Sequence, residues 1–561
     1  MKCFEITLEN VEIAIAKIRA VIGPAYVITH TSEVRERSKD LIPAVKLPSA
    51  FIYPANQDEI QAIIKIANEC KLPLWPCSKG KNWGYGAASP VLEGSLVLVL
   101  ERMNTIITVN EELAYAIVEP GVTYRQLNQH LKEHNIKLWC DCTDGPPDGS
   151  VMGNALDRGV GVTAYSDHFG HVCGMEVVLP TGELIRTGGG EFNNCKVWNT
   201  HKWGVGPYLE GLFSQSNFGI VTKIGIWLMP EPETSLAYTF DLRDDKDLSS
   251  AVDAIRTLAL KGVVVGAGHF FNDVVALAIL TQYPPELLQS GSSLSPEVRG
   301  KLRRRHGIAP WTLGGGIYGS TAEVDLRKRQ IKKALGALGK VDFIDGKKAS
   351  RLNRLIPWLK KAKAVSRFSP LIDVLLIQIF GKSLEFIEAA PHVYSLMQGI
   401  PSDYFVRHAY FKSRTPKPDT NIDPARDNCG LVWFAPISPL TGRNVLEVIE
   451  LCRPLFEKYG FDFYVVLLLQ NPRAVIVLMA VMYRKDDPEE AARAQALYEE
   501  LCRVTAEAGY PQYRTSVSHM ERIFDRVPEL RNLIDRIKSS LDPNNIMAPG
   551  KYGIGIMNSS T

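Results

Sequence analysis

The chain has 561 residues, of which 45% are hydrophobic and 22% are charged, and its formal net charge is only +3. This composition predicts a soluble globular protein long enough for more than one domain, and it excludes a largely disordered chain. The near balance of 64 basic and 61 acidic residues gives no electrostatic reason to expect nucleic acid or an anionic membrane as the main partner.

Two further classes are disfavoured by the pattern of residues. No apolar run is long enough to cross a bilayer, and the first 23 residues indicate a strand or loop followed by an amphipathic helix rather than a signal peptide. The 10 cysteines are scattered without a Cys-x-x-Cys pair, and the 11 histidines show no metal-binding spacing. We therefore expect no metal site, no disulfide framework and a cytoplasmic location.

The first ~230 residues are predicted to form an α+β block of short strands and helices. Residues 51–77 alternate a strand, a helix and a strand, and apolar residues recur in that helix at steps of three and four. Asn56 is the predicted N-cap of the helix, and Glu59 is its predicted capping-box partner. Residues 94–135 predict three strands and a helix.

Two more strand pairs are predicted before residue 230. Residues 174–188 indicate a hairpin that turns at Thr181-Gly182, and residues 218–230 indicate two strands that end at Pro230.

The pattern of predicted helices and strands changes after about residue 230. Residues 240–510 contain longer amphipathic helices and the strand patterns "GLVWFAPIS" and "RAVIVLMAVMYRK", which predict a second α+β domain. We place the domains at residues 1–230 and 231–509, and we expect residues 510–561 to return to the first domain and complete it.

The stretch "PCSKGKNWGYGAASP" is a glycine-rich loop that directly follows a predicted strand. Glycines allow backbone N–H groups to converge on an anion. The spacing fits neither a P-loop nor a Rossmann fingerprint, and an ordinary turn accounts equally well for this segment alone. Similar loops in "VEPGVTYRQL", "DGSVMGNALDRGVG" and "SQSNFGIVTKIG" favour a long folded ligand that lies across many backbone amides, as a dinucleotide does.

These motifs, followed by "GMEVVLPTGELIRTG", "QYRT" and "LDPNNIMAPGK", resemble the vanillyl-alcohol oxidase / 4-cresol dehydrogenase flavoprotein family in its 4-alkylphenol branch, from about Phe51 to Gly553. The resemblance implies an α+β, two-domain PCMH-type FAD-binding fold with an α+β cap domain over the isoalloxazine ring. It also implies a set of residues that contact FAD: Pro76, Ser78, Lys79, Gly80, Lys81, Asn82, Ser150, Gly153, Asn154, Gly219, Ile220, Val221 and Lys551.

The same resemblance places Tyr85, Tyr513 and Arg514 around the oxygen of a phenolate substrate. A guanidinium and two phenol hydroxyls lower the cost of ionising a phenol, and the ionised ring releases a benzylic hydride more readily. The family also keeps an acidic residue near the reacting carbon. Asp144 and Asp148 both compete for this role in a loop that is one residue longer than the family pattern, and we favour Asp144 by its distance from "LWCD".

Two departures from the family pattern matter. Leu431 occupies the position of the histidine that binds FAD covalently in many relatives, so we expect non-covalent FAD, with Cys429 or Tyr410 as alternative tethers. Val162 stands where the alcohol oxidase has a tyrosine, and "FYVVLLLQNPRAVIVL" is almost wholly apolar. Both features favour a larger or more apolar substrate pocket, although buried core also explains such strands. We assign Trp83 to packing.

The resulting prediction is an FAD-dependent oxidoreductase that takes a hydride from the benzylic carbon of a para-substituted phenol through a quinone methide. One alternative is a diverged flavin oxidase acting on a natural-product intermediate, by oxidative cyclisation, or on a hydroxy acid. Another is a flavin-fold binding module without catalysis. We expect a small phenolic substrate, oxygen or another electron acceptor, and a homodimer or larger assembly.

Overall fold

The N-terminal part of the chain is built on a four-stranded sheet with the order β1-β2-β4-β3. The computed structural model describes residues 6–290, 293–365 and 369–555. Strand β4 pairs in parallel with both β2 and β3, and parallel strands need a crossover connection. Helix α3 supplies the crossover between β2 and β3. The bounds are β1 Val27–Ile28, β2 Ala50–Ile52, α3 Gln57–Cys70, β3 Leu74–Cys77 and β4 Leu96–Val99.

The start of α3 confirms one half of the predicted cap. The Asn56 side chain accepts a hydrogen bond from the Glu59 N–H group. The Glu59 carboxylate accepts from the N–H group of Ala55 rather than from that of Asn56, so the predicted capping box is wrong in that detail.

A second sheet, with the order β5-β6-β10-β8-β9, is antiparallel throughout. The predicted turn at Thr181-Gly182 joins β8 to β9: Gly182 has φ of 89° and its N–H group donates to the carbonyl of Leu179. The bounds are β5 Ile106–Asn110, β6 Tyr115–Val118, β8 Val172–Val178, β9 Leu184–Arg186 and β10 Ile220–Trp227, with a separate pair formed by β7 Leu138–Trp139 and β11 Met229–Pro230.

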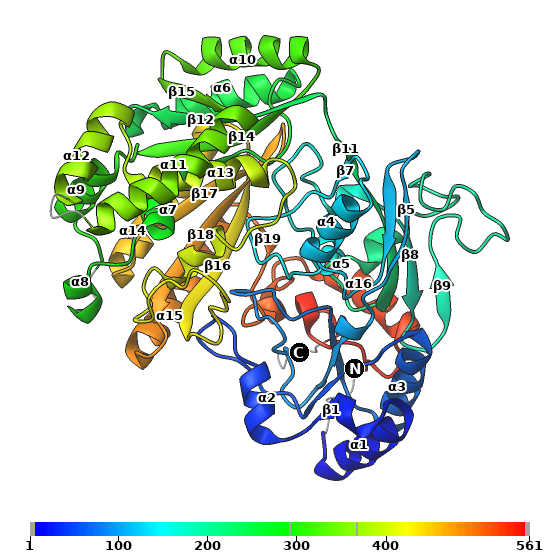
Figure 1. Ribbon diagram of the computed structural model, residues 1–561. Coiled ribbons are helices and arrows are strands. Elements are labelled where there is room, and N and C mark those ends of the chain that lie inside the picture. The colour runs from blue at the N-terminus through cyan, green and yellow to red at the C-terminus, as the bar shows by residue number, and fades with distance from the viewer. Residues whose placement is uncertain (1–5, 291–292, 366–368, 556–561) are drawn as a thin grey trace.

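The second half of the chain forms an eight-stranded antiparallel sheet with the order β15-β12-β14-β13-β17-β18-β16-β19. It occupies the upper left of Figure 1. The bounds are β12 Thr234–Leu242, β13 His269–Asn272, β14 Trp311–Gly319, β15 Gly339–Ile344, β16 Cys429–Pro439, β17 Tyr464–Asn471, β18 Ala474–Arg484 and β19 Gln512–Arg514.

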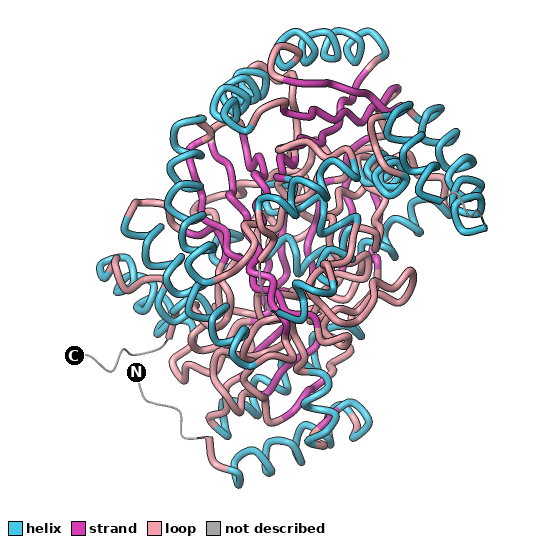
Figure 2. Tube along the Cα trace, turned by 90° about the vertical axis from the view of Figure 1, so that its left-hand side faces the viewer, coloured by secondary structure: helices cyan, strands magenta, loops and turns pink. Residues whose placement is uncertain are grey.

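Alternate residues of this sheet face opposite sides, because successive side chains of a strand point in opposite directions. In β17, Val465 and Leu467 belong to the core that four helices cover, whereas Val466 and Leu468 belong to a cluster on the other face. The covering helices are α6 Leu248–Leu260, α10 Thr321–Leu335, α14 Gly442–Tyr459 and α15 Pro488–Glu507. Figure 2 shows the strands in magenta with helices around them.

The remaining helices lie around these three sheets. Their bounds are α1 Leu8–Ile22, α2 Thr31–Arg37, α4 Tyr124–Glu133, α5 Val151–Leu156, α7 Asp273–Leu280, α8 Pro285–Ser290, α9 Pro296–His306, α11 Gly346–Val365, α12 Ser369–Phe380, α13 Leu384–Leu396 and α16 Pro528–Leu541. The mixture of helices and antiparallel and parallel strands confirms the predicted α+β class.

The C-terminal part, red in Figure 1, lies against the first sheet. The Leu74 N–H group donates to the carbonyl of Ile546, and Leu74 forms a parallel bridge with Met547. Strand β19 instead pairs with β16 of the large sheet. The domain boundaries at residues 230 and 509 stay a prediction.

Two searches of the described residues gave negative results. None of their helices is long and apolar enough to span a membrane. The same residues contain no group of three His, Cys, Asp or Glu side chains that are placed to bind a metal ion.

Candidate cofactor and substrate cavities

A cavity, here called the loop cavity, lies where the first two sheets meet the C-terminal part of the chain. Loops form most of its wall: the segment after β3, the start of α5, the segment before β10 and the turn Lys551–Gly553. Every residue that the sequence predicts to contact FAD lines it, namely Pro76, Ser78, Lys79, Gly80, Lys81, Asn82, Ser150, Gly153, Asn154, Gly219, Ile220, Val221 and Lys551. That these residues bind FAD stays a prediction, but the structure places them on one cavity.

The loop after β3 offers free backbone donors to this cavity. No described residue accepts a hydrogen bond from the N–H groups of Ser78, Lys79, Lys81 or Asn82, and Gly80 has φ of 62°. A left-handed residue within such a loop lets successive N–H groups converge, and unpaired N–H groups suit an anion such as a pyrophosphate. The loop therefore fits the phosphate part of FAD.

Helix α5 packs closely against this loop. Ser150 caps the helix by accepting a hydrogen bond of 2.8 Å from the Gly153 N–H group, and its hydroxyl donates to the carbonyl of Pro120. A Cβ atom on Gly153 would lie 2.8 Å from Oγ of Ser78, closer than Cβ contacts allow. The same Cβ would lie 3.2 Å from Cβ of Ser78 and 3.3 Å from that of Ser150, both tight contacts, so glycine favours the close approach of α5 to the loop.

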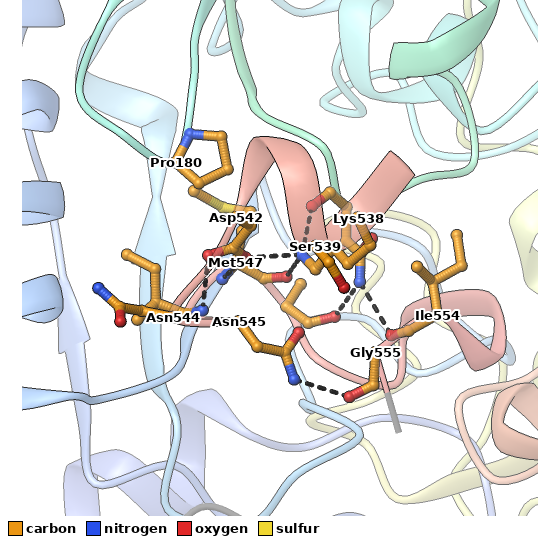
Figure 3. A network of polar contacts seen from close by, with 12 residues as sticks. Pro180, Lys538, Ser539, Asp542, Asn544, Asn545, Met547, Ile554 and Gly555 are labelled. Atoms are coloured by element: carbon orange, nitrogen blue, oxygen red, sulfur yellow. Dashed lines mark hydrogen bonds and ion pairs between the residues drawn. The ribbon is translucent and has the colours of Figure 1, made fainter. Parts of the chain in front are cut away.

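A buried ion pair holds the C-terminal segment at the loop cavity (Figure 3). Lys538 has no exposed surface, and its Nζ lies 2.7 Å from Asp542 Oδ2. The same Nζ donates 2.7 Å hydrogen bonds to the carbonyls of Asn217 and Met547. Burial lowers the pKa of Lys538 to about 8. The pair thus ties the loop before β10 to the segment that carries Lys551, a link that the sequence analysis missed.

A second cavity, here called the sheet cavity, adjoins the loop cavity. Side chains of β13, β16, β17 and β18 form one wall, and residues 81–85, 143–146 and 513–514 form the other. The four residues predicted to act on substrate, Tyr85, Asp144, Tyr513 and Arg514, all line it. Several residues line both cavities: Lys81, Asn82, Tyr85, Thr143, Pro146, Asn154 and Arg514. A ligand in one cavity would therefore lie next to a ligand in the other.

Arg514 brings the predicted phenolate-binding group together. Its guanidinium carbon lies 4.9 Å from the ring centre of Tyr85 and 5.7 Å from that of Tyr513. Nη2 of Arg514 donates a 2.9 Å hydrogen bond to the carbonyl of Asp157, which fixes the position of the guanidinium. Burial alone would lower the pKa of Arg514, but Tyr513, Asp157 and Tyr85 raise it above its usual value, so the side chain carries a full charge.

The hydroxyl of Tyr85 is buried and lacks a hydrogen-bond partner of acceptable geometry among the described residues. Burial raises the pKa of this phenol well above its usual value, and the nearby Tyr513 raises it further. A buried hydroxyl without a partner costs about 1–3 kcal/mol, which a ligand oxygen would offset.

Asp40, which the sequence analysis missed, fixes the Gly-Tyr-Gly turn that carries Tyr85. The buried Asp40 Oδ1 accepts a 3.0 Å hydrogen bond from the Gly84 N–H group. A Cβ atom on Gly84 would lie 2.6 Å from the Trp433 side chain, and Gly84 has φ of 79°. Burial raises the pKa of Asp40 to about 6. The turn therefore depends on distant residues as well as on its own glycines.

Asp144 and Asp148 occupy different surroundings. Asp144 lines the sheet cavity, with Oδ2 at 3.9 Å from Nδ1 of His269. Asp148 lines neither cavity, and its carboxylate accepts a 2.8 Å hydrogen bond from Arg125, which holds the pKa of Asp148 below its usual value. The position agrees with our choice of Asp144, whose role stays a prediction.

The alternative FAD tethers lie away from both cavities. Tyr410 donates a 2.5 Å hydrogen bond to Asp427, and burial raises the pKa of Cys429 to about 12. Neither residue is part of a cavity wall, whereas Leu431 lies in the wall of the sheet cavity. Val162 is buried, its N–H group donates to the Asp141 carboxylate, and it does not line the sheet cavity, so it gives no extra room there.

The apolar segment of β17 and β18 contributes both to the buried core and to the wall of the sheet cavity. Val465 and Leu467 lie in the core, whereas Val466, Leu468 and Leu478 line the sheet cavity. Trp83 also lines this cavity, with the Lys81 ammonium 4.8 Å from its ring centre. Packing alone therefore does not describe its position.

A buried pair that the sequence analysis missed supports Asn154, which lines both cavities. His168 Nε2 lies 2.7 Å from Asp141 Oδ2, and His168 Nδ1 lies 2.5 Å from Asn154 Oδ1. Burial alone would raise the pKa of Asp141, but the bond to His168 and its charge hold that pKa below its usual value. The pair orients the Asn154 amide between the two cavities.

Comparisons with known proteins identify the family. Residues 48–188 match the model "FAD binding domain", and residues 440–552 match "FAD linked oxidases, C-terminal domain". The chain is 35% identical over 546 residues to 1'-carboxy-chondrochloren decarboxylase of Chondromyces crocatus, with 97% of each chain covered. It is 31% identical over 553 residues to the 4-cresol dehydrogenase [hydroxylating] flavoprotein subunit of Pseudomonas putida, with 97% and 96% covered.

The crystal structure of p-cresol methylhydroxylase with substrate bound is similar along the whole chain. The TM-score is 0.85 at 29% identity, with 99% of each chain covered. This likeness confirms the predicted PCMH-type FAD-binding fold with an α+β cap domain. The chain therefore belongs to the vanillyl-alcohol oxidase / p-cresol methylhydroxylase family of FAD-linked oxidoreductases.

Proposed function

We propose that the protein takes a hydride from the benzylic carbon of a para-substituted phenol, with FAD held in the loop cavity without a covalent bond. The observation that carries the proposal is the wall shared by the two cavities. There Arg514 stacks against Tyr85 and Tyr513, and the buried hydroxyl of Tyr85 lacks a hydrogen-bond partner of acceptable geometry among the described residues. A phenol oxygen placed at this wall meets a fixed cation and two hydroxyl donors.

The side chains at this wall favour the ionised substrate. The charge of Arg514 lowers the pKa of a bound phenol, and hydrogen bonds from Tyr85 and Tyr513 to its oxygen lower it further. The phenolate donates electron density through the ring to the para position, which weakens a C–H bond of the benzylic carbon attached there. FAD, when bound, accepts the hydride, and the substrate becomes a quinone methide.

Asp144 assists the next step, the addition of water to the same benzylic carbon. Water that adds to the benzylic carbon of the quinone methide must lose a proton, and a carboxylate in the cavity wall accepts it. The product is then a benzylic alcohol, or an unsaturated phenol where a proton leaves the side chain instead.

The proposal that FAD is bound without a covalent bond rests on the residues at the positions where a covalent bond could form. Leu431 has no nucleophilic atom, and Cys429 and Tyr410 line neither cavity. Acid precipitation of the purified holoenzyme tests this: we expect the yellow colour in the supernatant, and flavin that stays in the pellet would refute the statement. The electron acceptor is oxygen or another carrier, the assembly is a homodimer or larger, and the location is cytoplasmic; these three are proposals.

A second candidate is the oxidation of a larger natural-product intermediate by the same hydride removal. It is favoured by the 35% identity to a protein named as a carboxy-chondrochloren decarboxylase, slightly above the identity to the 4-cresol enzyme. In that case the quinone methide loses CO2: the carbon–carboxyl bond breaks, and its electron pair forms a side-chain double bond and restores the phenolate.

One experiment separates these candidates. The holoenzyme is mixed without oxygen with 4-ethylphenol, a 4-hydroxybenzyl alcohol, a hydroxy acid without a phenol and a carboxylated 4-alkylphenol, and the flavin absorbance is followed. Bleaching by the phenols alone supports the proposal, and CO2 release from the carboxylated member supports the second candidate. Bleaching by the hydroxy acid alone would refute both. Air admitted afterwards shows whether oxygen is the acceptor.

A further inference from the structure

Four polar residues of the sheet cavity are not used by the phenolate group: Asp144, His269, His408 and Tyr464. We call this cluster the imidazole pole. Asp144 lies near enough to the other three for its charge to act on each of them. The His408 ring centre lies 5.9 Å from that of Tyr464, and Asp144 Oδ2 lies 3.9 Å from Nδ1 of His269, so the pole consists of two close pairs that line the same cavity.

The proton of His408 is fixed on one nitrogen. Nδ1 lies 2.7 Å from the carbonyl of Phe405, and because a carbonyl only accepts, Nδ1 must be the donor. Burial lowers the pKa of His408, so the ring is neutral and Nε2 carries a lone pair. No described residue donates a hydrogen bond to that lone pair.

His269 repeats this arrangement. The Asp144 carboxylate lies 3.9 Å from Nδ1, and its negative charge favours the proton on that nitrogen. Nε2 is buried without a hydrogen-bond partner among the described residues. Burial lowers the pKa of His269 as well, so its Nε2 is a second unpaired acceptor.

The imidazole pole is therefore rich in acceptors. It contains a carboxylate and two imidazole lone pairs, and its single hydroxyl donor is Tyr464, whose pKa burial raises. Of these acceptors, His269 Nε2 is buried without a donor among the described residues, which is costly, whereas the Asp144 side chain is 53% exposed. A ligand that supplies an N–H or O–H group removes that cost. A carboxylate on the ligand would meet the like charge of Asp144.

We infer that the sheet cavity recognises a second group on its substrate besides the phenol oxygen: a hydrogen-bond donor on the para side chain, such as a hydroxyl, an amide N–H or an amine. The inference rests on the proposed phenol oxidation and adds the class of side chain. His269 and His408 are then specificity-determining residues. The apolar strand residues of the sheet cavity contact the carbon skeleton between the phenolate group and the imidazole pole.

A set of matched phenols tests the inference. We would use 4-propylphenol, 4-(2-hydroxyethyl)phenol and tyramine, which differ in one terminal group, together with 3-(4-hydroxyphenyl)propanamide and the corresponding propanoate. The holoenzyme is mixed with each one without oxygen, and the rate constant of flavin bleaching is measured against concentration. Dissociation constants from tryptophan fluorescence provide a readout that does not need turnover.

We expect at least one donor-bearing phenol to be preferred to 4-propylphenol by about 10-fold, and the amide to be preferred to the propanoate. The donor-bearing phenol that is preferred most strongly over its matched compound identifies the donor as hydroxyl, amide or amine. In His408→Leu and His269→Leu, each ratio should fall to about one to three, whereas His408→Gln should keep most of it. His134→Leu, at the exposed residue that follows α4, is the matched control and should keep the wild-type ratios.

Preference for 4-propylphenol or for the propanoate, in rate and in binding, would overturn the inference. Ratios that survive both leucine substitutions would overturn it as well. If none of the phenols bleaches the flavin, the proposed function fails, and the order of the dissociation constants still decides whether the pole prefers donors.

Discussion

The loop cavity and the sheet cavity adjoin, but they are built in opposite ways. Backbone groups and small residues of glycine-rich loops form much of the first, as in the segment from Ser78 to Asn82, although side chains such as Phe213 and Met520 also line it. Side chains from strands and loops far apart in the sequence form the second, such as His269, Trp433 and Tyr513. A backbone-lined cavity leaves glycine-rich motifs in the sequence, whereas a side-chain-lined cavity leaves only strand patterns that resemble core.

The difference predicts how each cavity tolerates change. In the loop cavity a substitution should act sterically, because a larger side chain keeps two closely packed segments of the chain apart. In the sheet cavity it should act through the chemistry of one side chain. The predictions below test this contrast.

The largest effect is expected at Arg514, on the shared wall. In Arg514→Ala the fixed cation that stabilises the phenolate is lost, and kcat/KM for a 4-alkylphenol should fall by about 10³-fold. Stopped-flow bleaching without oxygen measures it. Arg514→Lys keeps a charge but not the planar fork and should lose less. A fall of less than about 10-fold in Arg514→Ala would show that the phenolate site is misassigned.

Gly153 tests the loop cavity. In Gly153→Val the new side chain meets Oγ of Ser78, which should displace α5 from the phosphate loop and weaken FAD binding by about 10- to 100-fold. Ultrafiltration of the purified protein with free FAD measures the affinity. Gly314→Ala is the control, because a Cβ there meets nothing within 4 Å. Equal FAD affinity in both variants would contradict the close-approach argument.

Asp144 and Asp148 form a matched pair within one loop. Asp144→Asn should lower turnover of a 4-alkylphenol by about 10-fold or more, because the carboxylate in the sheet cavity no longer accepts a proton. Asp148→Asn breaks an exposed contact with Arg125 and should change turnover by less than about twofold. Steady-state turnover compares them. Similar losses in both variants would leave the choice of Asp144 without support.

The last prediction concerns stability rather than activity, and it is made at Asp40. Burial raises the pKa of Asp40 from 3.8 to about 6, despite the nearby Lys485, so the folded chain keeps a proton that the unfolded chain releases between these values. Its contribution to stability is present below about pH 4 and is lost as pH rises through 6, by at most about 3 kcal/mol.

Asp40→Asn removes this titration while keeping an acceptor for the Gly84 N–H group. The variant should therefore unfold a few degrees above the wild type at pH 7.5, and the difference should shrink toward pH 4. Thermal unfolding at the two pH values measures it. A difference that does not depend on pH would contradict the assignment to Asp40.

Much of the fold and of the loop cavity could be predicted because their signals are local. The cap at Asn56, the turn at Gly182 and the strand before Ser78 each depend on a few consecutive residues. The imidazole pole and Asp40 could not be predicted in this way. His269 begins a strand and His408 lies in a short 3-10 helix, with no motif around either, and Asp40 contacts a turn more than 40 residues away.

By itself the sequence determined the α+β class, the glycine loops and the residues that belong to the family motifs, because backbone geometry and motif order are written in consecutive positions. Only the tertiary structure decided that the walls of the two cavities share Tyr85 and Arg514, that Asp144 rather than Asp148 reaches the sheet cavity, and that two imidazoles lie beside it. Those relations depend on which faces of distant strands and loops are packed together, and burial then sets their charge states.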